Sequence, residues 1–171
     1  HVPADALFQL NSVAISQGGT EYALGYWNKL SFPEYCYFFF RRSSTKWNVV
    51  DSVVVSPRNL ENRWGYNTLW ASPWGDVYSL GAGVFQLRGN AWFRIFHSQT
   101  ALVGISAVQE KNIFVVGHFG TVLHFNGTDW YQYTQFQNNE LVLSGVWSTG
   151  AEVFIVGYDS QGSKSFVFHG K

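Results

Sequence analysis

The chain has 171 residues, of which 46% are hydrophobic and 19% aromatic, against 13% that are charged. This composition can bury a sizeable core and favours strands that pack on both faces, so we expect an all-β fold with almost no helix. Eleven basic residues balance eleven acidic ones, which argues against nucleic acid as a partner, and no apolar run approaches the roughly 18 residues that span a membrane.

A short apolar strand that ends in glycine recurs four times along the chain. Its copies are residues 21–25, 77–81, 113–117 and 153–157, and each has an aromatic residue three positions before the glycine. A second short strand precedes each copy at a nearly constant distance, and its small-then-apolar pair is Ser12-Val13, Thr68-Leu69, Gly104-Ile105 or Gly145-Val146. Repeats of about 40 residues built from short strands are typical of β-propeller blades, because one small sheet cannot bury both of its faces alone.

We therefore predict a β-propeller of about four blades of antiparallel strands, forming one partial domain over residues 1–171. The blades are expected at about residues 10–56, 64–100, 101–140 and 141–171. In chain order, the later strands of the first three blades are expected at residues 36–42 and from Trp47, at 84–87 and 92–96, and at 121–125 and 130–135. The aromatic residues before the four glycines, Tyr22, Tyr78, Phe114 and Phe154, are expected to be equally buried between blades. Thr20, Asp76, Asn112 and Glu152 precede the second strand of each blade and are interpreted as hairpin residues that bond the turn amides, not as catalytic groups.

Residues 112–130 carry the clearest copy of the repeat, Asn-Ile-Phe-Val-Val-Gly-His-Phe-Gly-Thr-Val-Leu-His-Phe-Asn-Gly-Thr-Asp-Trp. This segment resembles the "DVFAVG…GTILHYDG…W" blade of a family of exported bacterial β-propeller proteins. The resemblance covers nearly the whole chain, except for a long insertion in the first blade. It implies a propeller architecture and carries no chemistry, since most members of that family have none assigned.

The fourth blade is predicted to lack its outer strand. Gly170 aligns with Gly89 and Gly127, so the matching fourth-strand Trp would fall two residues beyond Lys171, and Val167 aligns with His124. Either residues 6–10 supply the missing strand and close a small ring, or the four blades belong to a larger propeller. We favour the larger propeller because four-bladed rings are uncommon and leave a tight centre. Residues 166–168 should then form an unpaired edge or pair with a strand from elsewhere.

Motifs for catalysis, metals and cofactors are missing from the sequence. His118 and His124 are six residues apart, which is not a spacing that converges on a metal. The sequence has no glycine-rich phosphate loop and no Gly-x-Ser-x-Gly elbow. Cys36 lies in an apolar stretch and is expected to be a buried structural thiol. We therefore expect no enzyme, no metal and no cofactor.

Two irregular insertions, residues 26–35 and 56–65, depart from the repeat. Both connections are expected on one face of the propeller, and they are rich in the Trp, Tyr and Arg residues that dominate binding hot spots. The predicted binding residues are Trp27, Phe32, Tyr35, Arg58, Arg63 and Trp64. Alternatively, these loops only cap strand edges or pack on each other.

Together these features predict a non-enzymatic, protein-binding or scaffolding propeller whose partner is a protein or further propeller blades. The first residue is His1 rather than Met, which fits a processed chain, and we expect an extracytoplasmic location in a secreted or cell-surface assembly. The alternative is a carbohydrate-binding propeller whose exposed Trp or Tyr rings stack on sugars. A lectin would repeat its pocket in every blade, whereas the two insertions occur once, which favours a protein partner.

Overall fold

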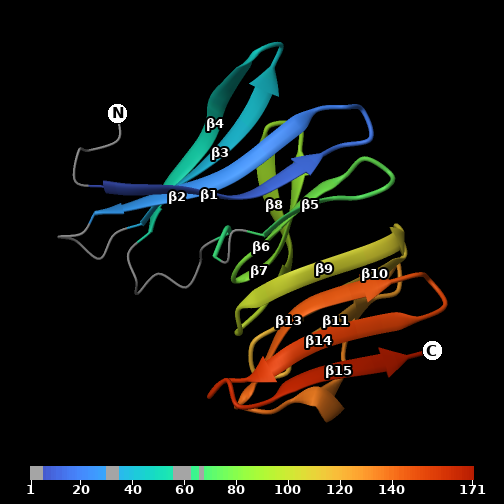
Figure 1. Cartoon of the computed structure of the whole chain (residues 1–171). Coiled ribbons are helices and arrows are strands. Elements are labelled where there is room, and N and C mark those ends of the chain that lie inside the picture. The colour runs from blue at the N-terminus through green and yellow to red at the C-terminus, as the bar shows by residue number, and fades with distance from the viewer. Residues whose placement is uncertain (1–5, 30–34, 56–62, 66–67) are drawn as a thin grey trace.

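The structure, a computed structural model, describes residues 6–29, 35–55, 63–65 and 68–171. Its strands form four antiparallel sheets that follow one another along the chain (Figure 1). The first sheet consists of β1 (Ala6–Ile15), β2 (Glu21–Lys29), β3 (Tyr35–Ser43) and β4 (Lys46–Val55). The second consists of β5 (Thr68–Ala71), β6 (Val77–Leu80), β7 (Gly83–Arg88) and β8 (Ala91–His97). The third consists of β9 (Leu102–Gln109), β10 (Asn112–Gly117), β11 (Val122–Phe125) and β12 (Trp130–Gln132), and the fourth of β13 (Leu141–Ser148), β14 (Val153–Asp159) and β15 (Ser165–Gly170).

Each sheet is a meander in which strands adjacent in sequence pair with each other, as in a propeller blade. The predicted all-β propeller fold is confirmed, and the described residues contain a single helix, the 3-10 turn η1 (Thr134–Phe136). This turn replaces the end of the strand predicted at residues 130–135, because the chain must leave the edge of the third sheet to reach the fourth. Within the described ranges, no helix is long and apolar enough to cross a membrane.

Alternate residues of each strand point to opposite faces of the sheet. We call the face turned toward the following sheet the B face, and the opposite one the A face. Tyr78 and Leu80, on the B face of the second sheet, pack against Ile113 and Val115, on the A face of the third. Corresponding clusters join Leu24 and Phe39 to Leu69 and Val77, and Val116 and Val122 to Leu143 and Ile155. The three interfaces between sheets are thus three copies of one contact, B face on A face.

The aromatic residues before the four glycines are not equally buried, so that prediction is wrong. Tyr78 is buried because Trp70 packs against it and its hydroxyl donates to Asp76 Oδ2 at 3.2 Å. Phe114 and Phe154 are only half-buried. Each stacks on a histidine ring of the next strand, and Phe154 also contacts the exposed Trp147 ring.

The hairpin residues bond differently from the prediction. The backbone amides of two of them are capped by hydroxyls just after the preceding strand, since Thr20 N donates to Ser16 Oγ and Asp76 N donates to Ser72 Oγ. The Asp76 carboxylate instead accepts from the Trp74 indole and from the Tyr78 hydroxyl. These side chains therefore stabilise their own sheets.

The register of β15 differs by two residues from the sequence alignment. Its pairing with β14 places Gly170 at the position that Leu87 has in β7 and Phe125 has in β11. Gly170 is therefore not equivalent to Gly89 and Gly127. The reason is the hairpin between β14 and β15, which is longer than the corresponding hairpins of the second and third sheets, so an alignment made on glycine alone is shifted.

The fourth sheet has three described strands, and β15 is its edge. Residues 6–10 belong to β1, which pairs with β2 and not with β15. Closure of a small ring by this segment is therefore wrong. Figure 1 shows the first and fourth sheets at opposite ends of the stack of sheets.

Candidate functional site

The predicted loop residues that the structure describes do not lie together on one surface. Trp64 is completely buried, with Phe39 at 6.3 Å and Trp92 at 6.4 Å between ring centroids. Arg63 lies over the Trp64 ring at 4.4 Å and forms an ion pair with Asp51 at 2.8 Å. Trp64 is therefore a core residue that joins the first two sheets and cannot touch a partner, which corrects its assignment as a binding residue.

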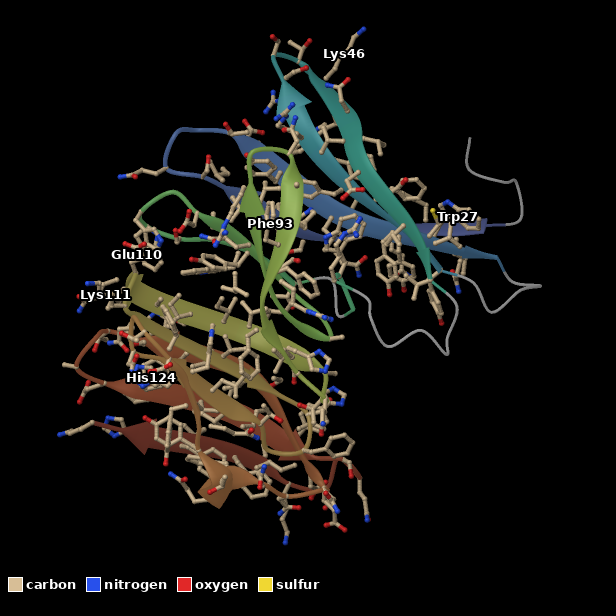
Figure 2. The ribbon with its side chains drawn as sticks, turned by 180° about the vertical axis from the view of Figure 1, so that it is seen from behind. Trp27, Lys46, Phe93, Glu110, Lys111 and His124 are labelled. Atoms are coloured by element: carbon tan, nitrogen blue, oxygen red, sulfur yellow. The ribbon has the colours of Figure 1, made fainter. Side chains whose placement is uncertain are left out.

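Trp27 and Tyr35 lie in strands rather than in a loop. Trp27, in β2, is half-buried and paired with Phe8 and Cys36 near the far end of the first sheet (Figure 2). Trp27 is on the A face, whereas Tyr35 packs with Tyr26 on the B face. Residues 26–29 and 35 of the predicted loop thus belong to strands β2 and β3, and residues 30–34 lie outside the described ranges.

The remaining predicted binding residues, Phe32 and Arg58, lie outside the described residues. Cys36 is buried as expected, and burial raises the pKa of its thiol.

A groove along the edge strand β15 is the better candidate site. Two cavities of about 410 Å3 each lie along this strand, and both are lined by Gln135, Phe136 and Phe168. The first also contacts Gly170 and Lys171 at one end of β15, and the second also contacts Lys164 and Phe166 at the other. The shared lining makes them one groove that runs along the edge of the fourth sheet.

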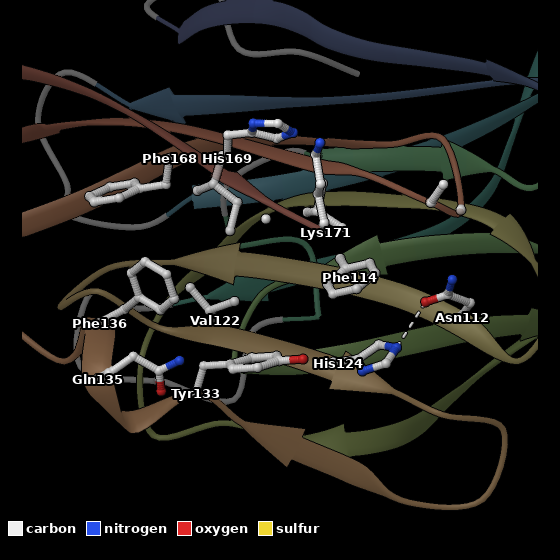
Figure 3. Close-up of a pocket in the computed structure, with 15 residues that line it drawn as sticks. Asn112, Phe114, Val122, His124, Tyr133, Gln135, Phe136, Phe168, His169 and Lys171 are labelled. Atoms are coloured by element: carbon white, nitrogen blue, oxygen red, sulfur yellow. Dashed lines mark hydrogen bonds between the residues drawn. The ribbon is translucent and has the colours of Figure 1, made fainter.

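The first cavity has an aromatic wall on one side and the edge of β15 on the other. Tyr133 and Phe136 extend from the third sheet, and Phe168 extends from β15 (Figure 3). Phe136 and Phe168 meet edge to face with their ring centroids 5.2 Å apart. These rings offer an apolar surface into which a further aromatic side chain could pack.

The inner sheets show what occupies the equivalent space. Trp92 of β8 lies opposite Leu87 and packs against Phe39 of the first sheet. Trp130 of β12, opposite Phe125, packs in the same way against the second sheet. The equivalent position beside Gly170 carries no described strand, and a Cβ at Gly170 would meet nothing within 4 Å. The groove therefore has the position and the aromatic lining of a fourth-strand site.

The polar groups of the groove are arranged around two histidines. His124 stacks on Phe114 with centroids 4.3 Å apart, and its Nε2 lies 2.8 Å from Asn112 Oδ1. Burial lowers the pKa of His124, so the neutral ring is favoured. His169, rather than Val167 as the alignment suggested, occupies the equivalent position in the fourth sheet.

The other end of the groove is polar. Lys164, Glu140 and Asp159 line it beside Phe166. The Asp159 pKa is lowered because its carboxylate accepts hydrogen bonds from the Ser163 hydroxyl and amide. In the part of the chain that the structure describes, no three His, Cys, Asp or Glu residues gather in a way that could hold a metal ion. The groove thus combines an unpaired strand edge, an aromatic cavity and charged groups at its far end.

The sequence had pointed to this edge without locating the groove. The position of residues 166–168 at the edge of the described fourth sheet was expected. The aromatic wall from Tyr133 and Phe136 was not expected, because residues 130–135 were assigned to a regular strand. The turn η1 places Phe136 over the cavity.

Comparisons with known proteins agree with the fold. No protein-family model matches the sequence, and no curated protein matches it. Seventeen chains of solved structures match the fold. One is the structure described as "YCF48 bound to D1 peptide", with a TM-score of 0.57 and 13% sequence identity over 86% of this chain. This chain spans about half of the matched one, 48% of its length. A likeness at this identity concerns the fold, and it supports the assignment of the four sheets to a β-propeller.

Proposed function

We propose that this chain is a protein-binding propeller that takes an extended segment of a partner as a fourth strand on β15. The observation that carries the proposal is the groove along β15, which lies where the inner sheets hold their fourth strands. Addition of a strand to an exposed sheet edge is a common mode of peptide recognition, in which backbone hydrogen bonds give affinity and side-chain pockets give specificity. The solved structure similar in fold was determined with a bound peptide, which supports a peptide as the ligand.

The register indicates how such a segment would bind. Val122, in β11, accepts a hydrogen bond at its carbonyl oxygen from Tyr133 N. Its backbone groups therefore point away from β10 and toward the fourth-strand side of the sheet. Val167 is its equivalent in β15, and its N–H and C=O are expected to face the incoming strand. An aromatic residue of an antiparallel segment would then lie beside Gly170, in the cavity lined by Tyr133, Phe136 and Phe168.

We propose the same setting that the sequence suggested, a non-enzymatic scaffold in an exported or cell-surface assembly. Its support is the resemblance of residues 112–130 to exported propeller repeats. Cell fractionation of the tagged protein tests this location, and recovery in the cytoplasm alone would contradict it.

The binding experiment uses a peptide with the sequence of residues 128–135 of this chain, Thr-Asp-Trp-Tyr-Gln-Tyr-Thr-Gln, labelled for fluorescence anisotropy. We expect saturable binding that weakens at least about tenfold when the peptide Trp is replaced by Ala, because the ring fills the cavity. The protein variant Val167→Pro should also weaken binding, since it removes one outward N–H that the strand needs.

Val167→Thr is the matched control because it keeps the N–H and the branched side chain, and it should bind like the unchanged protein. Binding that is equal for the two peptides and for Val167→Pro would contradict strand addition at β15. An absence of saturation up to about 1 mM peptide would do the same.

A further inference from the structure

The outer faces of the first and fourth sheets carry apolar residues at positions that the inner sheets bury. Val13 in β1 is 72% exposed, whereas its equivalents Leu69 and Ile105 are 6% and 8% exposed. All three follow the small residue of the innermost strand, so the repeat position is the same. Val13 differs because no described sheet covers the A face of the first sheet.

The B face of the fourth sheet shows the complementary difference. Leu24, Leu80 and Val116 occupy one repeat position and are each fully buried by the following sheet. Val156 has the same position, since it pairs with Gly145 as Val116 pairs with Gly104, yet it is 43% exposed. Trp147, Tyr158 and Val167 are exposed on or beside the same face.

The tryptophans of the fourth strands are also half-buried in the inner sheets and exposed in the first sheet. Trp92 and Trp130 are half-buried because each packs on the sheet before its own. Trp47, the second residue of β4 in the first sheet, lies opposite Arg42 and is exposed. The neighbouring charges are already compensated, since Arg42 pairs with Glu21 at 2.7 Å. The A face of the first sheet therefore has the side chains that an interface between sheets uses, and no described sheet covers them.

The B face of the fourth sheet also copies the chemistry of the B face of the third. His169 stacks on Phe154 with centroids 4.5 Å apart and ring planes 2° from parallel. His124 stacks on Phe114 at 4.3 Å and 4°. The B face of the third sheet packs on an A face, that of the fourth sheet. Because the B faces of the third and fourth sheets carry the same Phe–His stack, the B face of the fourth sheet should also pack on an A face of this repeat.

We propose that a second copy of this chain supplies that A face, so that the fourth sheet of one copy packs on the first sheet of the other. The complementary A face is present in this chain, but it lies at the opposite end of the stack (Figure 1). Two copies related by a two-fold axis would form both contacts at once and make a ring of eight sheets, within the size range of propellers. This inference concerns the faces of the end sheets and does not rest on strand addition at the edge of β15.

Light scattering after size exclusion, over a range of protein concentrations, tests the association. We expect a dimer that Val156→Asp and Val13→Asp each weaken at least about tenfold, because each places a carboxylate in an apolar contact. Val108→Asp is the control, since Val108 is exposed and lies outside both faces. Circular dichroism of each variant establishes that the sheets are retained.

Cysteine cross-linking tests the pairing of faces without a destabilising change. Leu24 and Leu69 share one core cluster, as do Leu80 and Ile105, so Val156 of one copy should lie near Val13 of the other. The double variant Val13→Cys with Val156→Cys should form disulfide-linked dimers under mild oxidation, whereas either single variant should not. The native Cys36, present in all three proteins, is buried. A monomer at all concentrations, or dimers that form equally well with Val13→Cys alone, would overturn the proposal.

Discussion

Replacement of Trp64 by alanine should lower the free energy of unfolding, because it removes a contact between the first two sheets. The Trp64 side chain is completely buried and contacts Phe39 and Trp92. A buried Trp removes about 150–250 Å2 from water, which at about 25 cal/mol per Å2 corresponds to about 4–6 kcal/mol. Residual structure in the unfolded chain reduces this value, while the cavity left behind adds to it, so we expect a loss of about 3–5 kcal/mol.

Urea unfolding monitored by circular dichroism measures this loss as a lower midpoint at an unchanged slope. Trp147→Ala is the matched control, because Trp147 is 60% exposed, and its loss should stay below about 1 kcal/mol when the chain is monomeric. A loss below about 1 kcal/mol for Trp64→Ala would show that Trp64 does not join the sheets.

Two further predictions concern backbone conformation and pH. Gly120 has φ of +66°, and a Cβ there would collide with the Phe136 carbonyl oxygen, whereas Gly89 has φ of +62° and open space around it. Gly120→Ala should therefore cost at least about 2 kcal/mol in urea unfolding and Gly89→Ala about 1 kcal/mol, and equal losses would contradict the close approach of η1 to the turn between β10 and β11. Burial lowers the pKa of His124, so the folded state favours the neutral ring and the free energy of unfolding should fall as pH drops below about 6.5. His124→Gln, which copies Gln86 of the second sheet, should make this decline between pH 7.5 and 5 shallower, and an unchanged decline would show that His124 does not contribute to it.

The sequence was sufficient to predict the four sheets because each repeat marks its own strands. The pairs Ser12-Val13 and Gly104-Ile105 hold the same register positions in the structure, since one pattern of small and apolar residues packs the same way each time. The unpaired edge at the fourth sheet followed from the same counting. Its exact register did not, because the length of the hairpin before β15 is not encoded in the repeat.

The candidate groove could not be predicted from loop composition. An insertion rich in aromatic residues can extend a hairpin, as Trp27 does in β2, or fill a core, as Trp64 does. Composition alone does not separate these outcomes from an exposed contact, because all three use the same side chains. The groove beside Phe136 depends on a turn between two sheets, which short-range patterns do not specify.

Amide hydrogen exchange of β15, with and without the peptide of residues 128–135, tests strand addition most directly. The account predicts that the outward amides of Val167 and His169 exchange fast in the free protein and become protected when the peptide binds, because they then donate to the added strand. The amides of Phe166 and Phe168, which face β14 in this register, should be protected in both states. Peptide binding without new protection at Val167 and His169 would contradict the account.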